Sequence, residues 1–301
     1  MSYRKVIGVA GLLILGCATG GYFYLRERSE ASARAWAASH EPEPGDSTSA
    51  PAPAAEVPAA PSRTATPPSP AKKESDPGVD AGLPLRGGEV LDYTANVANL
   101  SDVANLKLVV GAHKDFFGKN AWHLQAFAHT ENPLRMVFEL DDQFDSYSDA
   151  STMTSLQYEM HLSERGQKVS SVQRMTATGK EPAPPSVTEA RVLPGTRDPL
   201  GMMEYLRHVD WTKTAEVRCP VYDGHKLYDV RAKLAGSGEA VTVPAGSYKT
   251  SKIEIHVFEN GEEMKDAQFT MYIANNVART PVLLEAIMPF ATARVELKSA
   301  K

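Results

Sequence analysis

Most of the chain after Gly82 alternates between apolar and polar residues with a period of two. The clearest runs are residues 90–97, 106–110, 134–140, 156–162, 227–234, 253–257 and 269–273. This period turns alternate side chains to opposite faces, so each run predicts a strand with one buried and one wetted face, as in an antiparallel sheet. Turn signals at Asp223-Gly224, Pro244-Ala-Gly246 and Asn260-Gly261 separate the runs. We expect roughly ten to twelve strands.

One segment has the period of a helix. Asp198 is a good N-cap, Pro199 suits the first helical position, and Met202, Leu206 and Val209 fall on one stripe. Residues 180–185, KEPAPP, predict a loop before it. The whole pattern predicts a mainly β fold: a large curved antiparallel sheet or open barrel-like domain. The one short helix would cover an end of the sheet or lie in its concavity.

The chain begins with a few residues that include two basic ones, and an apolar stretch follows up to residue 25. This order is typical of an export signal. Two interpretations stay open. Residues 6–25, about 30 Å long as a helix, can remain as an uncleaved signal-anchor in the inner membrane. Alternatively, ILGC at residues 14–17 resembles a lipoprotein signal, with lipid attached to Cys17. We favour the anchor, because the chain stays apolar to Leu25.

Residues 26–81 are polar and rich in alanine and proline, and ten of the 21 prolines fall between Pro42 and Pro77. Such a segment cannot bury enough apolar surface to offset its ordering entropy, so it predicts a disordered linker. The expected organisation is therefore residues 1–25 as signal-anchor, 26–81 as linker and 82–301 as an exported β-rich domain. That organisation places the domain in the periplasm.

The net charge and the number of cysteines exclude several classes of partner and site. A net charge of −5 is too mild to indicate a nucleic-acid partner. Of the two cysteines, Cys17 lies in the apolar N-terminal segment, so the domain has Cys219 alone. This excludes an internal disulfide and a zinc site built from several cysteines. We expect Cys219 to be a small buried apolar residue.

Candidate catalytic and metal-binding residues are few. His123 and His129 share one strand face but lie about 20 Å apart, too far to share a metal. We expect His161, His225 and His256 to face solvent and His208 to lie on the polar side of the helix. Four aspartates form an acidic cluster in an expected turn, without the glycine and final glutamate of a calcium loop: Asp141, Asp142, Asp145 and Asp149. We predict no catalytic residue, metal or cofactor.

Five segments in order resemble the exported bacterial family named domain of unknown function 3108. They are residues 88–93 (GEVLDY), 140–149 (LDDQFDSYSD), 198–207 (DPLGMMEYLR), 221–229 (VYDGHKLYD) and 274–282 (ANNVARTPV). The positions that carry the likeness are Asp149, Tyr205, Arg207, Asp223, Gly224, Tyr228, Arg279 and Pro281. The resemblance covers about residues 87–297. It implies an exported β-rich domain without an established activity, and it supplies no catalytic residues.

The leading hypothesis is a non-catalytic, membrane-tethered envelope protein that binds an apolar ligand or lipid in its curved sheet. The alternative is a scaffolding module that binds another envelope protein through an exposed strand edge. A third hypothesis, an envelope hydrolase, would use carboxylates in the region from Asp141 to Asp149.

Overall fold

The computed structural model describes residues 85–175, 186–264, 268–288 and 291–301. The expected signal-anchor, Cys17 and the linker lie outside these residues, so they stay predictions. Among the described residues, no helix is long and apolar enough to cross a membrane.

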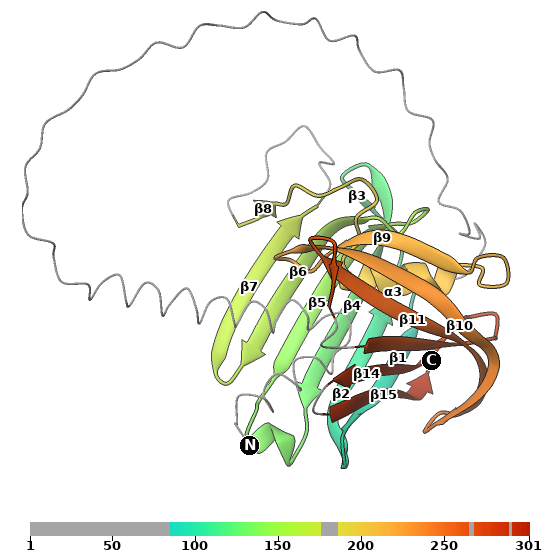
Figure 1. Ribbon diagram of the computed structural model, residues 1–301. Helices are drawn as coiled ribbons and strands as arrows, with labels where there is room; N and C mark the ends of the chain where they lie inside the picture. Colours follow the sequence, from blue (N-terminus) through green and yellow to red (C-terminus); the bar gives the residue numbers. More distant parts are fainter. Residues whose placement is uncertain (1–84, 176–185, 265–267, 289–290) are drawn as a thin grey trace, which may run out of the picture. The chain divides into compact units, whose positions relative to one another are not determined.

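The described residues form one sheet of fifteen strands (Figure 1). The strands are β1 Val90–Val97, β2 Leu100–Val110, β3 Lys114–Phe116, β4 Lys119–Thr130, β5 Asp141–Asp149, β6 Ser155–Glu164, β7 Gln167–Arg174, β8 Thr188–Glu189, β9 Glu216–Tyr222, β10 Leu227–Val243, β11 Gly246–Glu259, β12 Glu262–Glu263, β13 Gln268–Ala274, β14 Pro281–Met288 and β15 Ala291–Ala300. Their order is β8-β7-β6-β5-β4-β2-β1-β15-β14-β13-β11-β10-β9, with β3 beside β4 and β12 beside β11. Named neighbours pair antiparallel except β7 and β8.

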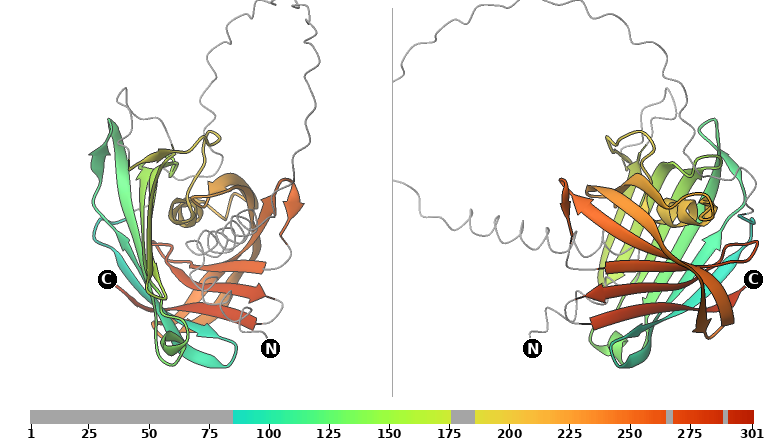
Figure 2. Two further views of the ribbon diagram at one scale, coloured as in Figure 1. Left: turned by 90° about the vertical axis from the view of Figure 1, so that its left-hand side faces the viewer. Right: turned by 45° about the vertical axis from the view of Figure 1, so that its right-hand side comes forward.

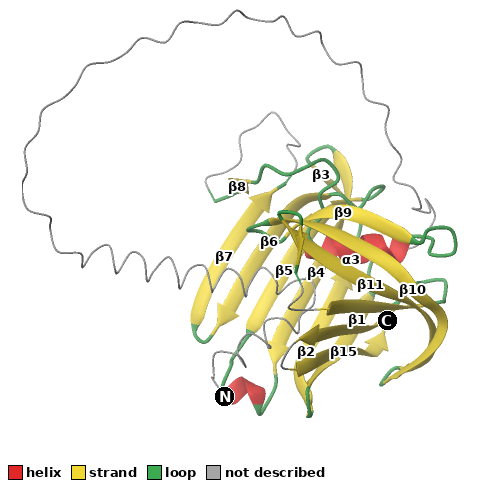
Figure 3. Cartoon of the chain, viewed as in Figure 1, coloured by secondary structure: helices red, strands yellow, loops and turns green. Residues whose placement is uncertain are grey.

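This architecture confirms the predicted fold class. Two helical segments accompany the sheet in the described residues, the α-helix α3 (Pro199–His208) and the short 3-10 helix η1 (Leu134–Met136), both red in Figure 3. The strand count exceeds the prediction partly because β3, β8 and β12 have only two or three residues each. Such short strands carry too little alternation to be recognised in a sequence.

The sheet curls into two facing walls, and α3 lies between them (Figure 2). One wall is formed by β2 and β4–β7, and the other includes β9–β11. Because α3 is covered from both sides, Met202 is its one residue that is not buried. The predicted apolar stripe is buried at Leu206 and Val209 and partly buried at Met202, which packs against the core. The buried surface extends further around the helix, to Leu200 and Met203.

The first residues of β6 are joined to β9 by a short segment that precedes α3. The Ser155 amide donates to the Thr196 carbonyl at 3.1 Å, and the Arg197 amide donates to the Pro220 carbonyl at 3.0 Å. Tyr222 N–H then donates to the Arg197 carbonyl at 2.8 Å. This segment spans the gap between two strands that do not pair, and it fixes where α3 begins.

Two local predictions were wrong. Residues 134–140 contain η1 and not a strand, since Phe138 N–H donates to the Leu134 carbonyl at 2.8 Å. Leu134 and Phe138 are both buried, a spacing of four that fits either period, whereas Met136 is 82% exposed and breaks the strand pattern. The expected acidic turn is instead strand β5, whose alternation turns Phe144 to the inner face.

Candidate functional site

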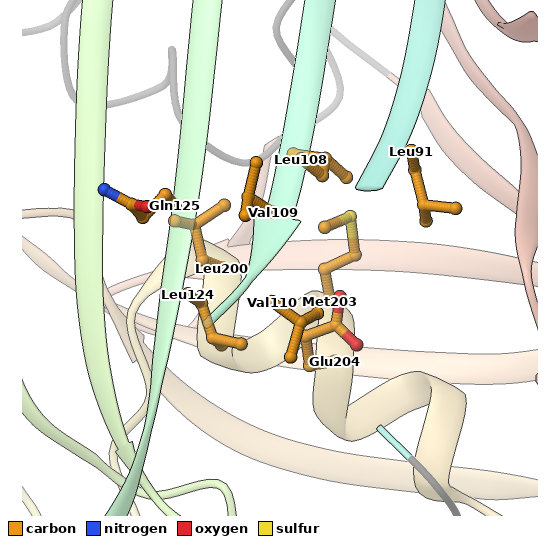
Figure 4. A pocket seen from close by; sticks show the side chains of 9 residues that line it. All are labelled: Leu91, Leu108, Val109, Val110, Leu124, Gln125, Leu200, Met203 and Glu204. Carbon is orange, nitrogen blue, oxygen red and sulfur yellow. The ribbon is translucent and has the colours of Figure 1, made fainter. Parts of the chain in front are cut away.

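An apolar pocket lies where α3 meets β1, β2 and β4 (Figure 4). Its lining residues are Leu91, Leu108, Val109, Val110, Leu124, Gln125, Leu200, Met203 and Glu204. The space at this lining, open solvent included, is about 250 Å³, and the centre of a water molecule fits in about 10 Å³ of it. That is room for about one water. Any larger occupant requires Met203 or α3 itself to move.

Glu204, at one side of this pocket, belongs to a buried ion cluster with Arg207 and Glu89. Arg207 Nη1 donates to Glu204 Oε2 at 2.8 Å and to Glu89 Oε2 at 2.9 Å, while Nη2 donates to Glu89 Oε1 at 3.0 Å. The side chains of Arg207, Glu204 and Glu89 are 3%, 4% and 11% exposed. Burial raises the pKa of Glu204 to about 7, against the opposing effect of Arg207. The cluster joins α3 to the start of β1.

The loop between β13 and β14 completes this joint. Arg207 Nη2 also donates to the Ala278 carbonyl at 3.0 Å. Arg279 Nη1 donates to the carbonyls of Val209 at 2.7 Å and His208 at 3.1 Å, which neutralises the free carbonyls at the end of α3. Tyr93 Oη donates to the Pro281 carbonyl at 2.7 Å. Three positions of the family resemblance, Arg207, Arg279 and Pro281, therefore meet here.

The N-terminus of α3 is held by a second polar cluster. Asp198 Oδ1 accepts from Gly201 N–H at 2.9 Å, which confirms the predicted cap, and Oδ2 accepts from the hydroxyls of Ser146 and Ser155 at 2.5 Å each. Burial raises the pKa of Asp198, and the two serine hydroxyls oppose this shift. A Cβ on Gly201 would lie 2.9 Å from Ser155 Oγ, so only glycine lets the helix approach so closely.

The remaining positions of the resemblance hold turns and packing contacts. The Arg197 guanidinium lies 3.6 Å from the centroid of the Tyr205 ring. Asp223 Oδ1 accepts from Lys226 N–H at 2.7 Å in the β9–β10 turn, where Gly224 has a φ of +96°. Tyr228 is 4% exposed on β10. Asp149 Oδ1 accepts from the Ser151 and Thr152 amides, and these bonds lower its pKa although burial opposes them.

The acidic residues of β5 do not converge on one site. Asp145 Oδ1 accepts from His123 Nε2 at 2.7 Å and from Gln125 at 2.8 Å, and its Oδ2 accepts from Gln143 at 2.7 Å. Asp141 pairs with Arg135 at 2.7 Å. Asp142 is 6% exposed and borders Glu164, and burial raises the pKa of Asp142 to about 7. Over the part of the chain that the structure describes, no three metal-ligating side chains gather.

The histidine predictions were partly right. His123 and His129 lie at alternate positions on the outer face of β4 and bond to different acids, Asp145 and Glu131. The side chains of His161 and His256 are 39% and 42% exposed. His208 corrects the prediction: it is 8% exposed, because the walls of the sheet cover both sides of α3, and Nδ1 lies 2.7 Å from the Glu204 carbonyl. Cys219 is buried, as expected.

Residues 92–298 match a family model described as a protein of unknown function, DUF3108. The chain belongs to this family. No curated protein sequence matches this DUF3108 chain.

Three solved structures resemble this DUF3108 protein over most of their lengths. A β-barrel-like protein of domain of unknown function DUF1849 from Brucella abortus has 11% identity and a TM-score of 0.47, covering 73% of this chain and 99% of that chain. A protein with a YmcC-like fold from Bacteroides fragilis, described as exported, has 10% identity and a TM-score of 0.32, covering 73% and 98%. A protein from Parabacteroides distasonis, described as a lipoprotein, has 13% identity and a TM-score of 0.34, covering 73% and 97%.

Sequence reasoning missed Glu89, Tyr93 and Glu204 as members of the joint around Arg207. The spacing of Glu204 and Arg207, three residues on one helix, is a recognisable signal for an ion pair. Glu89 lies 118 residues away from Arg207, so nothing local in the sequence connects them.

Proposed function

We propose that this DUF3108 protein is an exported, membrane-tethered envelope protein that binds one acyl chain or similar apolar ligand between α3 and the curved sheet, without catalysis. One observation carries the proposal: the pocket at α3 is lined mainly by aliphatic side chains from three strands and the helix. Such apolar linings with one or two polar groups are typical of small-molecule sites.

The pocket is smaller than the ligand that it would bind. Ligand pockets usually measure about 300–1,000 Å³, so an acyl chain must displace a side chain of α3. Met203 is the natural candidate, because its unbranched thioether adapts to many shapes. Glu204 at the same wall would then lie beside the bound chain.

The N-terminal sequence supports the cellular address in this proposal. The apolar residues 6–25 provide a membrane anchor, and the proline-rich residues 26–81 provide reach from that membrane. Lipid attachment at Cys17 is the alternative form of tether. The intact mass of the native protein distinguishes a chain that starts at Met1 from an acylated chain that starts at Cys17.

Lipid analysis of the full-length protein tests the ligand. The protein is purified from its native membranes in detergent and washed, and its bound lipids are extracted and quantified by mass spectrometry. Val110→Phe should reduce the bound lipid, because the larger ring fills the pocket. Val172→Phe, on the outer face of β7, is the matched control and should retain the lipid. Wild-type protein with no lipid above the detergent background would contradict the proposal.

A scaffolding function remains the second candidate, favoured by one observation. Within the described residues, β8 pairs only with Gln173 and Arg174, so most of the outer edge of β7 has no partner strand. An exposed edge is a template for an added strand. A stoichiometric protein partner after crosslinking in native membranes, lost in Val169→Pro, would favour this function over lipid binding.

A further inference from the structure

The outer face of the first wall carries a row of directly opposed residues. In register, His123 on β4 faces Tyr147 on β5, Tyr147 faces Gln157 on β6, and Gln157 faces Arg174 on β7. This face is opposite to the one that packs on α3. The row is therefore separate from the apolar pocket.

Arg174 is buried in this row almost without partners. The residue is 8% exposed, and its Nε is buried with no hydrogen-bond partner. Among the described residues, its side chain forms one hydrogen bond, from Nη2 to Gln157 Oε1, which is 3.5 Å long. Glu189 lies opposite Arg174 on β8, but its side chain is exposed and the two form no ion pair. A guanidinium has five N–H donors, so most of this donor set has no partner in the part of the chain that the structure describes.

Two other arginines of the described residues are buried as deeply, and both are paired differently. Arg207 donates to two carboxylates. Arg197 donates to the carbonyls of Gly195 at 3.0 Å and Thr152 at 2.9 Å. Taking a cation out of water costs several kcal/mol unless a partner compensates it. The surroundings of Arg174 therefore favour a binding site in which an anion from solution compensates the charge of the guanidinium.

An aromatic hairpin covers Arg174. Its guanidinium lies 4.2 Å from the centroid of the Phe117 ring, at the turn between β3 and β4, and Phe117 is 45% exposed. Phe116 stacks on Tyr147 with centroids 4.3 Å apart, and Lys114 Nζ lies 4.3 Å from the same Tyr147 ring. Strand β3 is joined to β4 by only three residue pairs. An anion that reached Arg174 from this side would have to displace the exposed ring of Phe117.

The carboxylates near this row already accept hydrogen bonds from other side chains. Glu159 Oε1 accepts from Gln157 Nε2 at 2.7 Å, and Asp145 accepts from His123 and two glutamines. Neither carboxylate bonds to Arg174. The second cation, on Lys114, adds to the positive charge at the hairpin.

We propose that Arg174 is the anchor of a binding site for a ligand that carries a carboxylate or phosphate group, which the guanidinium binds bidentately beneath Phe117. A planar fork of donors suits both anions. This site goes beyond the proposed lipid pocket, since it lies on the other face of the sheet and shares no residue with it.

Anion titration of the full-length protein in detergent tests the site. Sodium phosphate and sodium succinate are titrated separately at constant ionic strength, and the Tm and the heat of binding are recorded. A saturable response to phosphate or to succinate is expected, and the anion that gives it identifies the ligand class. Arg174→Met should weaken that binding by about ten- to a hundredfold. No saturable response to either anion would overturn the proposal.

The stability of the same variant without added anion separates ligand binding from a structural role. Because Arg174 lacks a paired carboxylate, Arg174→Met should keep or raise the Tm. A fall in Tm as large as that of Arg207→Met would show that Arg174 is paired within the fold, and would also overturn the proposal. Arg174→Lys, which keeps the charge without the fork, should bind more weakly than wild type but better than Arg174→Met.

Discussion

Arg207 and Arg174 are both buried arginines in one sheet protein, yet their surroundings differ. Arg207 is held by two carboxylates and two backbone carbonyls at the joint of α3, β1 and the β13–β14 loop. Within the described ranges, the side chain of Arg174 has one long hydrogen bond and a contact with an aromatic ring. The first arrangement compensates its charge inside the fold. The second leaves donors free, which is what recognition of an anion requires.

The largest effect should come from Arg207→Met. This change leaves Glu89 and Glu204 buried without a cation, and breaking a buried pair costs about 3–5 kcal/mol of unfolding free energy. Urea denaturation measures it. Arg231→Met, which breaks an exposed pair with Asp229, is the control and should cost no more than about 1 kcal/mol. Equal losses in the two variants would show that the joint does not stabilise the fold.

Asp198→Ala should have the next largest effect, at the other end of α3. It removes the cap of the helix and the carboxylate that accepts from the hydroxyls of Ser146 and Ser155, for a combined cost of about 2–3 kcal/mol. Asp149→Ala removes a comparable set of turn hydrogen bonds at a more exposed position. We expect it to cost less in the same denaturation assay, and the reverse order would contradict this account of α3.

The pair of Asp142 and Glu164 provides a third case, in which two buried acids have no bonded cation among the residues that the structure describes. Burial raises the pKa of Asp142 from 3.8 to about 7, so folding favours its protonated form. Its contribution to stability is therefore complete below about pH 4 and is lost as the pH rises to about 7. Asp142→Asn should flatten the decline of the unfolding free energy across this window. An unchanged pH dependence of the unfolding free energy would show that Asp142 does not bind the proton that folding takes up in this range.

Phe117→Ala should have the smallest effect on stability, within about 0.5 kcal/mol, because the ring is 45% exposed. The same change should alter anion binding, since it removes the cover over Arg174. Phe116→Ala is the matched variant: its ring stacks on Tyr147, so it should destabilise the protein more. If Phe117→Ala lowered the Tm further than Phe116→Ala, the hairpin turn would be a packing element and not a cover.

Individual residues show how much of the candidate site could be predicted from the sequence. Asp198 and Pro199 marked the start of α3 correctly, because a helix cap is a local interaction between neighbouring residues. Arg207, Arg279 and Pro281 were singled out through the family resemblance, but their contact with Glu89 and Tyr93 was not predictable. Residues 134–140 failed because a spacing of four satisfies a helical turn as well as a strand.

The sequence by itself determined most of the longer strands, the α-helix Pro199–His208 with its cap, and the turns that separate β9 to β12, since periodicity and capping act over a few residues. The tertiary structure decided which charges far apart in the chain meet. Glu89 reaches Arg207 across 118 residues because the sheet curls around α3, and Arg174 lies under Phe117 because β3 folds across the outer face. A buried charge is costly unless a partner compensates it. Arg207 has that compensation within the fold, whereas Arg174 would receive it from the proposed anion.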